Sequence, residues 1–114
     1  MFGFGMPDVP EIEAQEVFDN IQKSKDTVIV DVRTPHEYSR GFIAGSINIP
    51  VSELVGKIER EVPDKTKTIY VYCLSGSRST TAVAVMSKMG YANVFSMKSG
   101  LLAWRMNQLP LSTP

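Results

Sequence analysis

Two short runs of β-branched and aromatic residues limit the folds that this chain can adopt. Residues 27–32 (TVIVDV) are almost wholly apolar until Asp31, and residues 68–72 (TIYVY) are equally β-prone. Such runs are typical of parallel strands that are covered on both faces. A segment with helical signals follows each run, so strands and helices alternate along the chain. This order predicts the α/β class, with a parallel sheet flanked by helices on both faces.

Weaker patterns supply the remaining elements. Pro35 fits the first turn of a short helix, and Gly41 supplies its end. Ser52 is a candidate N-cap of the next helix, and Gly90 ends the helix after that. The predicted helices cover residues 12–21, 35–40, 51–60, 79–89 and 99–107, and the additional strands cover residues 46–50 and 93–97.

The length and charge of the chain set further limits. At 114 residues it suits one domain, because two halves would each be too small to bury a core. Twelve basic residues balance twelve acidic ones without a block of like charge, so we expect neither nucleic acid nor an anionic membrane as a partner. We predict a flexible N-terminal segment over residues 1–8, a domain over residues 9–110 and a tail over residues 111–114.

The sequence shows no signal for a membrane or for secretion. No apolar run approaches the roughly 20 residues that a membrane-spanning helix needs. The first residues are apolar, but they lack the basic region that opens a signal peptide. We therefore expect a cytoplasmic protein.

Cys73 is the only cysteine, so it cannot form an intramolecular disulfide, which fits a reducing compartment and leaves a free thiol. It follows the strand over residues 68–72, and parallel sheets bind ligands outside the carboxyl ends of their strands. Small residues and Gly76 let the backbone curl so that N–H groups point inward, and the following helix directs its positive end to the same place. We expect this cradle to stabilise an anionic sulfur, as thiolate or as persulfide.

The alternative reading of Cys73 is a small buried apolar residue, which is what most free cysteines are. Its place after a strand, with Gly76 three residues later and Arg78 two beyond that, favours chemistry instead. An exposed, reactive thiol of this kind is expected to oxidise readily with peroxide.

Four segments in order resemble the successive motifs of rhodanese-like domains. They are residues 31–38 (DVRTPHEY), 41–50 (GFIAGSINIP), the cysteine loop at 73–79 (CLSGSRS) and 99–104 (SGLLAW). The resemblance extends from about residue 12 to residue 109. It implies a rhodanese-like, five-stranded parallel sheet flanked by helices. The implied activity is transfer of sulfane sulfur from a donor such as thiosulfate, or from a protein persulfide, to a thiophilic acceptor.

The resemblance also assigns roles within the site. Cys73 corresponds to the nucleophile, whose thiolate attacks the outer sulfur of the donor and then passes its persulfide sulfur to cyanide or a thiol. No metal or organic cofactor is implied. Phe42 and Ser99 depart from the family pattern, which often has histidine and glycine at these positions. The active-site loop comprises Leu74, Ser75, Gly76, Ser77, Arg78 and Ser79.

Charged residues near the cysteine loop are candidates for supporting roles. The guanidinium group of Arg78 suits either an anionic donor or a carboxylate that ties down the loop, and we favour the carboxylate, with Asp31 or Glu37 as its partner. Arg33 is expected either to anchor the loop or to attract thiosulfate. Ser79 is expected to be a helix cap. His36 is expected at the surface, and one histidine with one cysteine falls short of a zinc site.

Two other functions use the same elements. Phosphatases and arsenate reductases hold an oxyanion in a similar loop, but they place five residues between cysteine and arginine, whereas four separate Cys73 from Arg78. A tighter loop suits a sulfur atom better than a phosphoryl group. A non-catalytic binding module of this family would typically lack the cysteine, which this chain keeps. A carrier that receives its sulfur from a partner protein is a variant of the favoured function.

Overall fold

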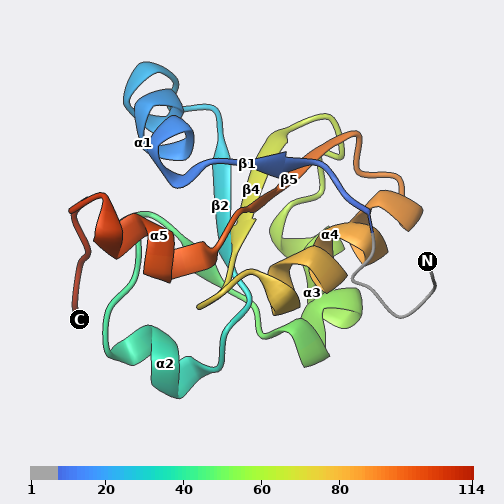
Figure 1. Cartoon of the computed structure of the whole chain (residues 1–114). Coiled ribbons are helices and arrows are strands. Elements are labelled where there is room, and N and C mark those ends of the chain that lie inside the picture. Colours follow the sequence, from blue (N-terminus) through green and yellow to red (C-terminus); the bar gives the residue numbers. More distant parts are fainter. Residues whose placement is uncertain (1–7) are drawn as a thin grey trace.

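The two β-prone runs become neighbouring strands in the middle of one sheet, as the computed structural model shows for residues 8–114 (Figure 1). Residues Val28–Asp31 form β2 and Thr68–Tyr72 form β4. All strand pairs are parallel, in the order β1-β5-β4-β2-β3. The predicted parallel sheet is therefore confirmed. The other strands are β1 (Glu11–Ile12), β3 (Ile47–Asn48) and β5 (Asn93–Met97).

Helices cover both faces of the sheet, and the alternation of side chains along β4 shows why. Ile69 and Val71 point to one face, where they pack with residues of α3 (Leu54–Glu61) and α4 (Ser77–Lys88). Tyr70 and Tyr72 point to the other face, which is covered by two further helices. Because neither face of β4 meets water over residues 69–72, each of these residues contributes to a core. The helices on the second face are α1 (Ala14–Lys23) and α5 (Gly100–Met106).

The short helix α2 (Pro35–Ser39) is capped as its sequence suggests. The Thr34 hydroxyl accepts a hydrogen bond from the N–H group of Glu37 at 3.2 Å, and the Glu37 carboxylate accepts one from the N–H group of Thr34 at 3.0 Å. This reciprocal pair fixes the first turn of the helix. It also fixes Glu37, whose carboxylate bonds to the cysteine loop.

Several element boundaries differ from the prediction. Ile12 lies in β1 and α1 begins at Ala14, so the helix predicted over residues 12–21 began two residues too early. The predicted third helix is divided into a 3-10 turn, η1 (Val51–Glu53), and α3, and the side chain of Ser52 caps neither. The predicted fourth helix begins two residues earlier than expected, at Ser77.

The end of the chain returns to the body of the domain. Phe42 and Ser112 exchange two backbone hydrogen bonds, of 2.9 and 2.7 Å. The indole N–H group of Trp104 donates to the carbonyl oxygen of Pro110 at 2.9 Å. The predicted flexible N-terminal segment lies, up to residue 7, outside the described residues. No helix within residues 8–114 is long and apolar enough to cross a membrane.

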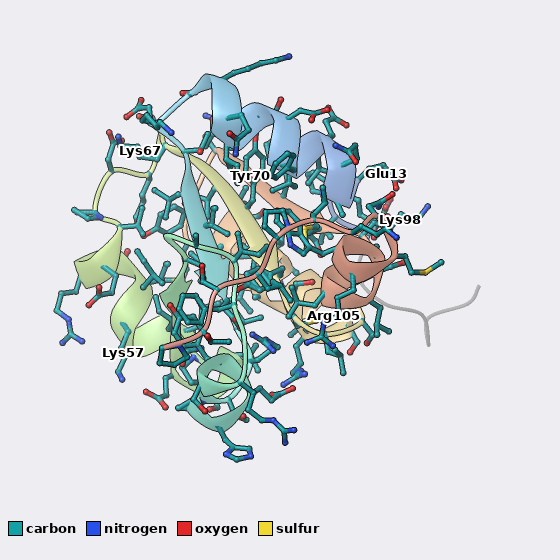
Figure 2. All side chains as sticks on the ribbon, turned by 90° about the vertical axis from the view of Figure 1, so that its left-hand side faces the viewer. Glu13, Lys57, Lys67, Tyr70, Lys98 and Arg105 are labelled. Carbon is teal, nitrogen blue, oxygen red and sulfur yellow. The ribbon has the colours of Figure 1, made fainter. Side chains whose placement is uncertain are left out.

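Most charged side chains lie at the periphery of the molecule. Figure 2 shows Lys57, Lys98 and Arg105 projecting outward, whereas Tyr70 is enclosed between the sheet and α1. The phenol of Tyr70 accepts a hydrogen bond from the side-chain amide of Asn20 at 3.0 Å. The enclosed polar atom of this aromatic side chain is thus satisfied.

Candidate functional site

Cys73 follows β4 directly and opens the loop that leads into α4. Its side chain is completely buried, so the expectation of an exposed thiol is wrong. The Sγ atom accepts hydrogen bonds from the N–H groups of Gly76 at 3.1 Å and Ser79 at 3.4 Å. The Ser79 hydroxyl lies 3.7 Å from the same sulfur. Sγ therefore lies among hydrogen-bond donors at the carboxyl end of a central strand.

The curl of the loop depends on Gly76. Its φ of +109° lies in the region that favours glycine, and it is the residue from which α4 starts. A Cβ atom at this position would also lie 3.3 Å from the backbone nitrogen of Ser99. Because the helix starts here, Ser79 lies in its first turn, and the prediction that Ser79 is the cap is wrong.

The start of α5 closes over the other side of the cysteine loop. The N–H group of Leu101 donates to the carbonyl oxygen of Cys73 at 3.0 Å, and that of Leu102 donates to the carbonyl oxygen of Leu74 at 3.1 Å. The approach is so close that a Cβ atom on Gly100 would lie 2.3 Å from the Cys73 oxygen. Ser99 adopts a φ of +60°, which explains why the family often has glycine there. The motif at residues 99–104 thus shapes the site from outside the loop.

Arg78 binds Glu37 rather than Asp31. Its two terminal nitrogens donate to the two carboxylate oxygens of Glu37 at 2.7 and 3.0 Å, with both side chains about two-thirds buried. This hydrogen bonding lowers the pKa of Glu37 from its ordinary 4.5 to about 2, although burial opposes the shift. The same pair raises the pKa of Arg78. The first turn of α4 is therefore tied to α2.

We expect Glu37→Gln to remove about 1–2 kcal/mol of stability at neutral pH, a value reduced for the partial exposure of the pair. Because the folded-state pKa lies below the ordinary one, this stabilisation is complete above pH 4.5 and is lost as the pH falls towards 2. Urea unfolding of both proteins at several pH values measures the difference. It should shrink across that window, and a difference that stays constant down to pH 2 would contradict the assignment.

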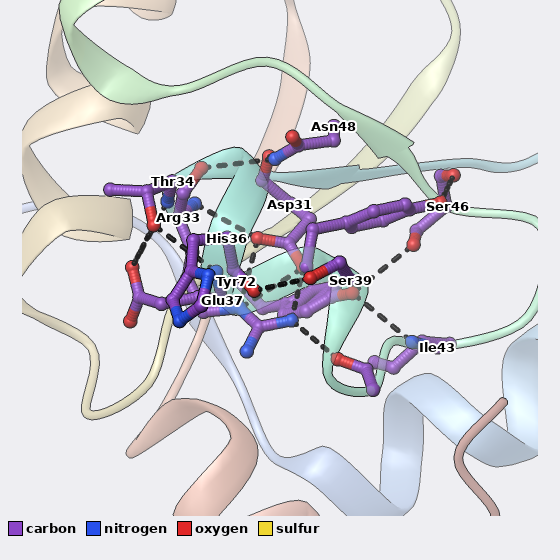
Figure 3. A network of polar contacts seen from close by, with 12 residues as sticks. Asp31, Arg33, Thr34, His36, Glu37, Ser39, Ile43, Ser46, Asn48 and Tyr72 are labelled. Carbon is purple, nitrogen blue, oxygen red and sulfur yellow. Dashed lines mark hydrogen bonds and ion pairs between the residues drawn. The ribbon is translucent and has the colours of Figure 1, made fainter. Parts of the chain in front are cut away.

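Asp31 and Arg33 form a separate buried pair on the sheet side of the site (Figure 3). The guanidinium group of Arg33 is only 4% exposed and donates to both oxygens of Asp31, the shortest contact being 2.6 Å, and to the carbonyl oxygen of Gly41 at 2.7 Å. Both groups are thus occupied with each other and with the segment after α2. Neither of the two roles expected for Arg33 is supported. Its side chain does not contact the cysteine loop, and its charge is not exposed to thiosulfate.

Tyr72 extends this network beneath the segment that follows α2. Its phenol oxygen bonds with the N–H group of Ile43 and the hydroxyl of Ser46, each at 3.1 Å. Burial, together with the negative charge of Asp31, raises the pKa of Tyr72, so the phenol stays protonated. Figure 3 shows how these bonds join β4 to the residues between α2 and β3.

The remaining loop residues differ in exposure. Ser75 and Ser77 are exposed and line a polar hollow of about 480 Å³ beside the loop, together with Lys98 and Ser99. Leu74 is half-buried against the core on the α5 side. A second hollow of about 430 Å³, between α1 and Trp104, does not include Cys73.

Three other residues complete the comparison with the predictions. His36 is exposed, as expected. Phe42 stacks on Tyr38 with ring centroids 4.3 Å apart, so an aromatic pair occupies the place where relatives often have histidine. Ser96 of β5 is completely buried behind the cysteine loop and was not predicted. Its only signal in the sequence is a polar residue among the apolar residues Val94, Phe95 and Met97. Within residues 8–114 no three metal-ligating side chains gather at one place.

Comparison with known proteins places this geometry in a family. The family profile described as the rhodanese-like domain matches residues 13–107. The chain belongs to the rhodanese-like family. Among solved structures, a rhodanese-related protein from Thermoplasma volcanium superposes with a TM-score of 0.81 at 34% identity, over 92% of this chain and 99% of the other. The predicted rhodanese-like fold is confirmed.

Curated members of the rhodanese-like family include two informative relatives. A protein from Allochromatium vinosum named sulfurtransferase is 32% identical over 93% of this chain and 97% of its own length. The thiosulfate sulfurtransferase PspE of Escherichia coli is 43% identical, but the match covers only 57% of this chain and 62% of PspE. Relatives in the rhodanese-like family are thus named for sulfur transfer.

Proposed function

We propose that this rhodanese-like domain is a sulfurtransferase in which Cys73 carries sulfane sulfur as a persulfide. The observation that carries the proposal is the hydrogen bonding of Sγ by the N–H groups of Gly76 and Ser79. Further N–H groups of the loop remain to bind an anionic outer sulfur or a donor. Those without an acceptor in the described part of the chain belong to Leu74, Ser75, Ser77 and Arg78.

The proposed reaction has two steps, both at Cys73. The Cys73 thiolate attacks the outer sulfur of thiosulfate, a sulfur–sulfur bond forms to Sγ, and the old one breaks with its electron pair leaving on sulfite. The acceptor, cyanide or a thiolate, then attacks the outer sulfur of the persulfide and restores the Cys73 thiolate. The negative charge lies on Sγ before the first step and after the second, and on the outer sulfur of the persulfide between the two steps. The N–H groups of Gly76 and Ser79 at Sγ, together with the remaining N–H groups of the loop, therefore supply donors for all three states.

Sulfur transfer fits the position of Arg78 better than phosphoryl transfer does. A phosphatase or arsenate reductase needs its loop arginine to bind the oxyanion above the cysteine, whereas Glu37 engages both terminal nitrogens of Arg78. The four-residue spacing points the same way. The free Cys73 thiol suits a reducing compartment, and a cytoplasmic location is therefore part of the proposal.

Incubation of the purified protein with thiosulfate tests the proposal. We expect the intact mass to increase by one sulfur atom, and cyanide or dithiothreitol to reverse the gain. A gain only with a cysteine desulfurase as donor would identify a carrier loaded by a protein. If neither donor loads the protein, the proposal is wrong.

A further inference from the structure

Two serine hydroxyls form a buried chain behind the sulfur. Ser96 of β5 and Ser79 of α4 are both completely buried, and their Oγ atoms lie 2.8 Å apart. Ser79 Oγ lies 3.7 Å from Cys73 Sγ. The hydroxyl of Ser96 has no other hydrogen-bond partner within residues 8–114, although its neighbours Phe95 and Met97 pack in the core. A polar side chain that is buried in a core usually makes a specific hydrogen bond.

The Ser79 hydroxyl has one proton and three neighbouring acceptors. It can donate to the carbonyl oxygen of Gly76 at 3.1 Å, to Ser96 Oγ or to the sulfur. Donation to Gly76 would leave the sulfur with its two backbone donors alone. The direction of the Ser79 hydroxyl therefore decides whether the anionic sulfur gains a third hydrogen bond.

Ser96 affects the hydrogen bonding of Ser79 because the Ser96 hydroxyl has one acceptor to which it can donate. The only acceptor that it meets in residues 8–114 is Ser79 Oγ. When Ser96 donates to Ser79, the Ser79 proton must go elsewhere, and a hydroxyl that accepts a hydrogen bond becomes a stronger donor. A negatively charged sulfur is a better acceptor than a carbonyl oxygen that Thr80 already approaches at 2.7 Å. The chain then runs from Ser96 to Ser79 to sulfur.

We propose that Ser96 is a positioning residue that donates to Ser79 Oγ and so strengthens and orients the Ser79 hydroxyl as a donor to the anionic sulfur of Cys73. Its importance for catalysis rests on the proposed sulfur transfer, but its effect on the thiolate does not. Arg78 of α4, held by Glu37 of α2, is the charged side chain that interacts electrostatically with Cys73. That pair is untouched in the variants below, so it does not contribute to their differences.

A double-mutant cycle tests the connection. We expect Ser96→Ala to slow persulfide formation from thiosulfate about 3- to 10-fold, the effect of one hydrogen bond. Ser79→Ala should slow it at least as much, and the variant with both changes should be no slower than Ser79→Ala alone. Equal rates for Ser96→Ala and the unchanged protein, or a full additional loss in the double variant, would overturn the proposal.

A second readout does not depend on sulfur transfer. Since Cys73 is the only thiol, the ultraviolet absorbance of its thiolate can be followed against pH, with Cys73→Ser as the blank. The midpoint should rise in Ser96→Ala, because the Ser79 hydroxyl becomes a weaker donor to the anion. Ser46→Ala removes another buried serine hydroxyl, one bonded to Tyr72, and should leave the midpoint unchanged. If no donor loads the protein but the midpoint shifts, the proposed function fails and the positioning role stands; an unchanged midpoint overturns the role.

Discussion

Replacement of Cys73 by serine is expected to abolish sulfur loading and leave the fold intact. Serine fills nearly the same space, and its oxygen can accept the hydrogen bonds that Gly76 and Ser79 donate to Sγ. The hydroxyl cannot form a persulfide, and no other thiol exists to replace it. Intact mass after incubation with thiosulfate measures loading, and circular dichroism checks the fold.

Cys73→Ala is the matched control for this experiment. It removes the same reactive group without placing a hydroxyl in a completely buried position. Both variants should show no loading. Cys73→Ala leaves the N–H groups of Gly76 and Ser79 without their acceptor and should lose about 1–2 kcal/mol of stability, whereas Cys73→Ser keeps an acceptor for them. Turnover retained by either folded variant would show that the sulfur passes through another group.

A methyl group at Gly100 is expected to be far more damaging than at other glycines with positive φ. The new Cβ atom would lie 2.3 Å from the carbonyl oxygen of Cys73 and 2.6 Å from that of Leu74, and backbone atoms cannot move aside as a flexible side chain would. To relieve the overlap, α5 must move away and lose its two hydrogen bonds to the loop. We expect Gly100→Ala to lose about 3 kcal/mol or more, together with sulfur loading.

Gly45→Ala is a suitable control because it introduces backbone strain without steric overlap of the new Cβ atom. Gly45 also has a positive φ, +84°, but no atom lies within 4 Å of a Cβ placed there. Its replacement should cost about 1 kcal/mol through backbone strain alone. Chemical denaturation of the two variants gives the comparison directly. Equal losses would mean that the contact between α5 and the cysteine loop is looser than the structure shows.

The centre of the sheet could be predicted from sequence because β4 and β5 each contain their own apolar signal. The bounds of β4, at Thr68–Tyr72, and of β5, at Asn93–Met97, agree with the prediction. Strand β1 could not be found in this way. It is two residues long and exists through pairing with β5, so nothing in its own composition distinguishes Ile12 from the first apolar residue of a helix.

The position of the candidate site could be predicted from the sequence, but the contacts between its residues could not. The place of Cys73 after a strand follows from chain order alone. Which carboxylate meets Arg78 depends on how α2 lies against α4, and sequence offered Asp31 and Glu37 on equal terms. The role of Ser79 depended on the conformation of Gly76, because the left-handed turn there moved the start of α4. Ser96 became visible only once β5 lay behind the loop.

The way in which Cys73 is held affects which sulfur donors and acceptors could reach its sulfur. Its carbonyl oxygen is bound by the start of α5 and its sulfur by the start of α4, so the residue is anchored on two sides. A persulfide would lengthen this side chain by only one sulfur–sulfur bond, about 2 Å. If Cys73 carries sulfur as proposed, the outer sulfur therefore stays close to the loop. Small molecules and thiols on protruding, flexible segments would then be able to reach it, whereas a thiol set into the flat face of a folded partner would not.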